Sequence, residues 1–171
     1  MHDNWAILSK FQEEYLTIDT GSILDVGSMD MNGSCKHLWE GWKYTGLDIL
    51  QGPNVDIVVS ETEDWNLSQS FDVVISLNTV EHCKDPFHLF KQIGLASKGL
   101  VLVTSPFFIK PHILPIGDAQ TKELLCTIGD YWRLLPDAMI MLLKDNGIDP
   151  INVGVTKDYI DTYAVGKSIK R

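Results

Sequence analysis

The length, composition and charge of the chain bound what it can be. It has 171 residues, typical of one domain, and 44% of them are hydrophobic, which excludes a disordered protein. The formal net charge of −9 disfavours binding to nucleic-acid phosphates, and no apolar run reaches the ~20 residues of a membrane-spanning helix. No leader pattern stands at the start, and the three cysteines (Cys35, Cys83 and Cys126) are widely spaced. We therefore expect a cytoplasmic domain without a nucleic-acid or membrane partner.

The first third of the chain predicts one helix followed by three strands. Apolar side chains recur at helical spacing over residues 5–17, which predicts an N-terminal helix within residues 1–18. Three short runs rich in valine and isoleucine then predict strands at 22–27, 44–49 and 55–59. Their near-continuous hydrophobicity is typical of strands in a parallel sheet covered on both faces.

The middle of the chain continues the alternation of strand and helix. Residues 71–77 and 99–105 predict two more buried strands. Between them, Asp85 is a capping residue and Pro86 fits the first helical position, so a helix is expected over residues 87–96.

The last third begins with an unusual segment. Residues 106–135 follow a strand end and predict a loop on the substrate side that acts as a lid, with a short helix over 121–127. A further helix is expected over 136–144, and then an antiparallel strand pair at 152–156 and 161–165.

This order of elements predicts an α/β fold. We expect residues 1–171 to form one Rossmann-like, doubly wound domain: parallel strands, a C-terminal antiparallel hairpin, and helices on both faces. In such sheets the ligand binds at the carboxyl ends of the strands.

Two residues at predicted strand ends indicate a nucleoside cofactor. Gly27 follows the first strand, where a missing side chain lets backbone approach a ligand, and the next helix is expected to offer free N–H groups. Asp48 ends the second strand, where a carboxylate can accept hydrogen bonds from ribose hydroxyls. Either residue alone is more often a turn former, and it is the pair that favours the functional interpretation.

Several motifs then resemble the class I S-adenosylmethionine-dependent methyltransferases. They are Ile23–Ser28 with Asn32–Ser34, Tyr44–Asp48, Phe71–Ser76 followed by Val80–Pro86, and Asp130–Arg133. One departure concerns the first loop, because the family usually has three closely spaced glycines there. Here only Gly27 is present, and Gly33 follows six residues later.

The resemblance implies S-adenosyl-L-methionine as cofactor and S-adenosylhomocysteine as product. Asp25, Gly27 and Ser28 would line the methionine moiety, together with the adjoining Met29. Asp48 would bind the ribose. The remaining cofactor contacts implied by the resemblance are Ile49 on the adenine face, Glu61 or Thr62 at the adenine edge, and Asn78 and Val80 beside the methionine and the methyl group.

The resemblance also suggests where the acceptor binds. His82 follows the fourth strand and could take a proton from an attacking oxygen or nitrogen, or it could be structural together with Glu81. His112 is a second candidate base. Asp130, Tyr131 and Arg133 would form a polar rim, in which Arg133 either clamps an anionic substrate group or makes an ion pair that fixes the loop.

A metal site is not predicted from the spacing of the soft ligands. Cys35 with His37, and His82 with Cys83, lack the paired spacing of a structural zinc site.

The sequence thus predicts an enzyme that transfers a methyl group to an oxygen or nitrogen of a small-molecule or sugar-like acceptor. One alternative is a non-catalytic S-adenosylmethionine-binding module of the same fold within a larger assembly. A nicotinamide-dependent oxidoreductase is the other, but residues 27–29 lack the glycine pattern that it needs. The acceptor and the oligomeric state are not predicted.

Overall fold

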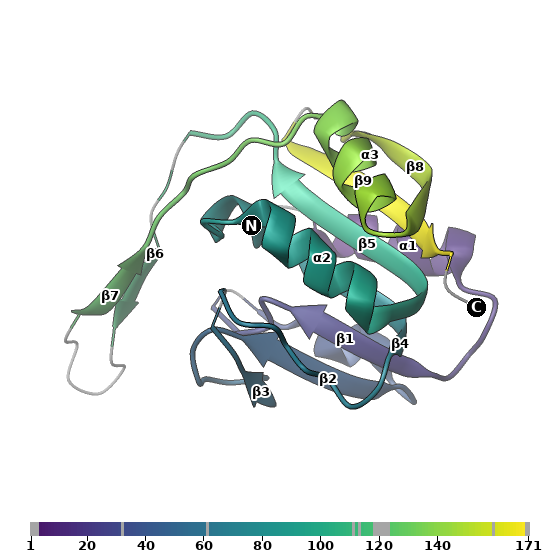
Figure 1. The fold of residues 1–171 in the computed structure, drawn as a ribbon, viewed down its shortest axis with the longest axis horizontal. Coiled ribbons are helices and arrows are strands. Elements are labelled where there is room, and N and C mark those ends of the chain that lie inside the picture. Colours follow the sequence, from purple (N-terminus) through teal and green to yellow (C-terminus); the bar gives the residue numbers. More distant parts are fainter. Residues whose placement is uncertain are drawn as a thin grey trace.

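A seven-stranded sheet forms the centre of the molecule (Figure 1). The computed structural model describes residues 4–31, 33–60, 62–110, 112, 114–117, 124–158 and 160–169. The strand order is β3-β2-β1-β4-β5-β9-β8. The strands are β1 (Ser22–Val26), β2 (Lys43–Asp48), β3 (Ile57–Val58), β4 (Phe71–Leu77), β5 (Ser97–Pro106), β8 (Ile148–Val155) and β9 (Asp161–Ser168).

The sheet is mostly parallel, as predicted. Strands β3, β2, β1, β4 and β5 run parallel, and β9 pairs antiparallel with both β5 and β8. The strand order reverses at β1, which lies between β2 and β4. A crevice therefore opens at the carboxyl ends of these three strands. The Rossmann-like fold with a C-terminal antiparallel hairpin is confirmed.

Helices cover both faces of the sheet because each central strand is apolar on both sides. In β1, Leu24 packs in one core cluster and its neighbour Ile23 in the other. Consecutive strand residues point to opposite faces, which explains the near-continuous apolar runs of the sequence. The Leu24 cluster lies under α2 (Pro86–Ala96) and α3 (Pro136–Asp145). The Ile23 cluster lies under α1 (Asn4–Tyr15).

Two short 3-10 helices and one capped helix shape the crevice. The turn η1 (Cys35–Trp39) follows the loop after β1, and η2 (Val80–His82) follows β4. Helix α2 begins as predicted: the Asp85 side chain accepts a hydrogen bond from the backbone N–H of His88 at 3.0 Å.

A separate β-hairpin extends away from the main sheet (Figure 1). It consists of β6 (Leu114–Gly117) and β7 (Leu124–Ile128), which pair antiparallel. The helix predicted over 121–127 is therefore wrong for 124–127, because backbone pairing with β6 holds these residues extended; residues 121–123 lie outside the described ones. Among the described helices, none has the length and apolar character needed to cross a membrane.

Candidate functional site

A cavity of about 870 Å³ lies at the carboxyl ends of β1, β2 and β4. This volume is within the range of small-molecule and cofactor sites. Asp25 and Gly27 line it from β1 and its loop, Asp48 from β2, and Asn78 and His82 from the segment after β4. The strand-end residues selected from the sequence thus meet in one cavity.

Gly27 brings two loops into close contact. Its backbone φ of +81° is a conformation that residues other than glycine rarely adopt. A Cβ atom at this position would also lie 2.1 Å from Oγ1 of Thr79, which donates a hydrogen bond to the Val26 carbonyl at 3.2 Å. The Thr79 side chain fills the space that a side chain at position 27 would need, so glycine here allows the loops after β1 and β4 to pack closely.

The backbone N–H groups at the start of this loop are not free for a ligand, contrary to the expectation. Those of Gly27 and Ser28 donate to the Leu47 carbonyl at 2.8 and 3.2 Å, so they point towards β2. The following helix is only the five-residue turn η1. Among the described residues of this loop, no helix starts directly after Gly27 to supply the expected N–H donors.

Asp48 organises the cavity wall between β1 and β2. One carboxylate oxygen accepts from the N–H of Met29 at 3.0 Å, and the other from the N–H groups of Ile49 and Leu50 at 2.7 and 3.3 Å. Since each oxygen has two lone pairs, the oxygen facing Met29 retains one for a ligand hydroxyl. Ile49 is half-exposed at the rim of the cavity.

Asp25 is a buried acid that lines the cavity. Its carboxylate accepts hydrogen bonds from the Tyr44 hydroxyl and, at 3.4 Å, from the Cys35 thiol. Burial raises the pKa of Asp25 to about 6, and these hydrogen bonds oppose the rise. At neutral pH the side chain is an anion facing the cavity.

Asn78 and Val80, both predicted to lie beside the methionine, differ in position. Asn78 lines the cavity and is held by a hydrogen bond from the Thr104 hydroxyl at 2.9 Å and one to Asp161 at 3.3 Å. Val80 is fully buried in the core cluster under α2 and does not line the cavity.

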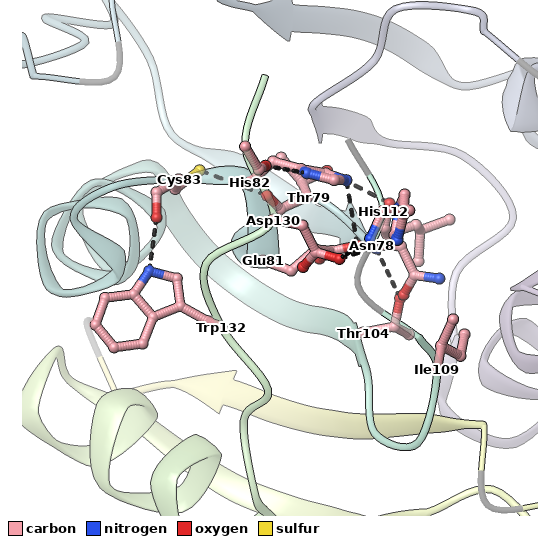
Figure 2. A network of polar contacts seen from close by, with 12 residues as sticks. Asn78, Thr79, Glu81, His82, Cys83, Thr104, Ile109, His112, Asp130 and Trp132 are labelled. Carbon is pink, nitrogen blue, oxygen red and sulfur yellow. Dashed lines mark hydrogen bonds and ion pairs between the residues drawn. The ribbon is translucent and has the colours of Figure 1, made fainter. Parts of the chain in front are cut away.

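Glu81, His82 and His112 form a cluster (Figure 2), and all three line the cavity. Nδ1 of His82 lies 2.6 Å from the Gly129 carbonyl. A carbonyl only accepts, so Nδ1 carries the proton and the lone pair is on Nε2, which lies 3.7 Å from a Glu81 oxygen. Burial lowers the pKa of His82, so this ring is neutral at pH 7.

The other two members of the cluster differ in exposure. Glu81 is fully buried, and burial raises its pKa to about 8. His112 is half-exposed, and its Nδ1 lies 3.1 Å from Asp130. The His82 and His112 rings stand nearly perpendicular with centroids 5.0 Å apart.

Asp130 and Arg133 form an ion pair with each other, and neither residue lines the cavity. The guanidinium donates to both Asp130 oxygens, one at 2.7 Å, and to the Ile109 carbonyl. Arg133 lowers the pKa of Asp130 to about 2. Of the two roles considered for Arg133, the geometry corresponds to the ion pair that fixes the loop. Tyr131 is exposed outside the cavity, and its N–H donates to the Glu81 carbonyl at 2.7 Å.

The remaining predicted residues divide by position. Ser28 and Met29 line the cavity, whereas Thr62 is exposed outside it. Glu61 lies outside the described residues. Trp5 of α1, which was not among the candidate site residues, also lines the cavity. It carries no motif, and only the packing of α1 brings it there.

The fold and cavity together define a Rossmann-like protein with a ligand site at the reversal of strand order. Residues 6–147 match the family model "Methyltransferase domain". Because this match covers most of the sequence, the chain belongs to the methyltransferase domain family.

Solved structures with the same fold include several methyltransferases. One is the glycopeptide N-methyltransferase MtfA complexed with S-adenosyl-L-methionine: TM-score 0.66, 13% identity, covering 96% of this chain and 87% of that one. Another is the N-terminal domain of EvdMO1 with S-adenosylhomocysteine and D-fucose: TM-score 0.62, 15% identity, coverage 98% and 84%. A third is the 1,6-didemethyltoxoflavin N1-methyltransferase of Burkholderia thailandensis: TM-score 0.61, 12% identity, coverage 96% and 76%. No curated protein matches the sequence.

Proposed function

We propose that this protein transfers a methyl group from S-adenosylmethionine to an oxygen or nitrogen of a small-molecule or sugar-like acceptor. One observation carries the proposal: a single cavity joins the Gly27–Asp48 wall to the His82–His112 cluster. The bound cofactor supplies an electrophilic methyl group on a sulfonium, and in-line attack removes the positive charge. The protein's task is then to orient the two partners.

The residues of the β1–β2 side fit such a cofactor. The backbone at Gly27 lines the cavity and would lie against its amino acid part. Asp25 supplies a buried negative charge for a cationic group, and the free lone pair of Asp48 would accept from a ribose hydroxyl. Ile49 offers an apolar contact for adenine at the rim.

The opposite end of the cavity is suited to the acceptor. Nε2 of His82 has a free lone pair and could hold a proton leaving the acceptor, and His112 could do the same. Trp5, Ile109 and Ile128 line this cavity from α1 and from the base of the hairpin, which supports residues 106–135 as the substrate-side lid of one domain over residues 1–171. We propose a cytoplasmic location, without a nucleic-acid or membrane partner.

Calorimetry with S-adenosylhomocysteine tests the cofactor site. The wild-type protein should bind it, and Asp48→Ala should lower the affinity at least about tenfold because a ribose hydroxyl loses its charged acceptor. Asp19→Ala, an exposed aspartate on the loop before β1, is the matched control and should bind normally. Absence of binding to the wild type at millimolar ligand would refute the proposed function.

A second function is favoured by the first loop. Its glycine pattern is reduced to Gly27, and the neighbouring N–H groups are already bonded to Leu47. A non-catalytic S-adenosylmethionine-binding module would show cofactor binding without methyl transfer to any acceptor in a tritiated-methyl assay over sugars, phenols and amines. Turnover of one acceptor would exclude this alternative.

A further inference from the structure

The Glu81 carboxyl group is buried without a hydrogen bond in the described part of the chain, and it contacts Nε2 of His82 at 3.7 Å. Its side chain is 1% exposed, and neither oxygen has a hydrogen bond within the described part of the chain. Buried polar groups are almost always hydrogen-bonded, and an unpaired buried carboxylate is costly. Glu81 nevertheless lines the cavity, so a ligand there could supply the missing partner.

The two histidines each bring one ring nitrogen close to Glu81. The Gly129 carbonyl fixes the proton of His82 on Nδ1 and so leaves Nε2 free on the Glu81 side. In the same way, Asp130 contacts Nδ1 of His112. Ring nitrogens that ligate metals are commonly oriented by a carbonyl or carboxylate on the other ring nitrogen. Both histidines have that supporting contact.

The donor atoms are close enough to share one ion. One nitrogen of each histidine and one Glu81 oxygen all lie within 4.8 Å of one another. Ligands at ~2.0–2.2 Å from an ion stand roughly 3–4 Å apart, so closing the site needs about 1 Å of movement. His112, with 40% of its side chain exposed, has room to make it.

We propose that Glu81, His82 and His112 bind a divalent transition-metal ion at the acceptor end of the cavity. Two imidazole nitrogens and one carboxylate favour zinc, cobalt, manganese or iron over magnesium and calcium, which prefer oxygen ligands. Three protein ligands leave coordination positions open, as in catalytic rather than structural sites.

The charges around the cluster agree with a cation. Arg133 is the cation nearest to this cluster in the interactions described, and it is bound to Asp130 on both oxygens. The Glu81 carboxylate therefore has no counter-ion in direct contact within the described residues. Burial raises the pKa of Glu81 to about 8, so a dication would bind by displacing the proton of this group, and the resulting carboxylate would offset part of the charge of the ion.

The metal site also narrows the acceptor, on the condition that the proposed function holds. With the Nε2 lone pair of His82 on the ion, the ion would take over the role of that histidine by lowering the pKa of a bound hydroxyl. An amine bound to the ion would lose the lone pair it needs for attack, so the acceptor class would be a hydroxylated small molecule rather than an amine.

Titration with Co²⁺ tests the site without the cofactor, because Co²⁺ bound by nitrogen and oxygen ligands changes its visible absorption. The protein, freed of any affinity tag, should bind one Co²⁺ with saturation. Glu81→Gln keeps the side-chain volume and His112→Ala alters a half-exposed residue, and each should weaken binding at least about tenfold. His37→Ala, an exposed histidine of η1, should bind Co²⁺ like the wild type.

Two results would overturn the metal site: no saturable absorption change at millimolar Co²⁺, or unchanged affinity in both Glu81→Gln and His112→Ala with their folds intact by circular dichroism. Calorimetry with S-adenosylhomocysteine on the same samples separates the two proposals. Cofactor binding without Co²⁺ binding refutes only the metal site, and Co²⁺ binding without cofactor binding refutes only the proposed function.

Discussion

At the scale of single residues, Gly27 at the end of β1 is required for two reasons: its backbone conformation and the space that Thr79 occupies beside it. Gly27→Ala would place a side chain on a backbone with φ +81° and drive its Cβ into Thr79. We expect the free energy of unfolding to fall by about 2–4 kcal/mol, the sum of left-handed strain and overpacking. Chemical denaturation measures this loss.

Gly41→Ala separates the two contributions. Gly41 has a similar φ of +83°, but a Cβ added there would meet its nearest neighbouring atom, in Thr20, at 3.9 Å, which is ordinary contact. We expect a loss of only about 1 kcal/mol, from the backbone alone. Equal losses in the two variants would contradict a close approach of Thr79 to Gly27.

Asp25 gives the protein a pH-dependent stability of a definite sign. In the folded state its pKa is about 6, above the ordinary value of 3.8. Between these pH values the folded protein holds a proton that the unfolded chain has released, so this group lowers the free energy of unfolding as pH rises. The stabilising contribution of Asp25 to the free energy of unfolding is present below about pH 4 and is lost as pH rises through about 6.

Asp25→Asn removes this titration while keeping the shape of the side chain. Its stability relative to the wild type should increase by up to about 3 kcal/mol between pH 4 and pH 7, from a shift of about two units. Urea denaturation of both proteins at several pH values measures the difference in their free energies of unfolding. The titration of all other groups is common to the two proteins and cancels in this difference. A constant difference would show that Asp25 titrates normally.

Residue positions at strand ends were predictable, whereas the directions of side chains within turns were not. Parallel strands bring Gly27, Asp48 and Asn78 to one edge, whatever the loops do. Val80 and His82 lie in one 3-10 turn, yet one faces the core and the other the cavity. Only the packing under α2 decides between them.

At the scale of elements, capping and strand patterns were reliable because they depend on local chemistry. The Asp85 cap and Pro86 place the start of α2, and paired apolar faces define β1, β4 and β5. The β6–β7 hairpin was not foreseen, since its apolar residues fit helical spacing as well as strand spacing. Residues 114–117 pair with residues 124–128, and the hydrophobic periodicity of either segment alone does not predict this contact.

The Asp85 cap connects helix stability to the candidate site, because α2 begins directly after the Glu81–His82 turn. Asp85→Ala should reduce the free energy of unfolding by about 1 kcal/mol by leaving the N–H of His88 unpaired. Asp137→Ala is a matched control: this residue lies in the first turn of α3 but is not its cap. Its loss should be smaller, within about 0.3–1 kcal/mol from the helix dipole alone. Thermal denaturation followed by circular dichroism compares them.

At the scale of the whole molecule, the cavity draws on segments spread from residue 5 to residue 128 of the chain. Trp5 of α1 lines it together with residues from β1, β2 and β4 and the base of the hairpin. A ligand in this cavity therefore contacts segments on both faces of the sheet. We expect ligand binding and global unfolding to be coupled in one cooperative transition.

S-adenosylhomocysteine should consequently raise the melting temperature of the wild-type protein. At a concentration of 100 times its Kd, mass action adds about 2.7 kcal/mol, which corresponds to a shift of roughly 5–10 °C for a domain of this size. A nicotinamide dinucleotide at the same concentration should give no shift, because the loop after β1 has only Gly27 where that cofactor needs a glycine-rich turn. Differential scanning calorimetry measures both. A shift confined to one of two resolved transitions would show that the cavity belongs to only part of the chain, and a larger shift with the dinucleotide would reverse the cofactor assignment.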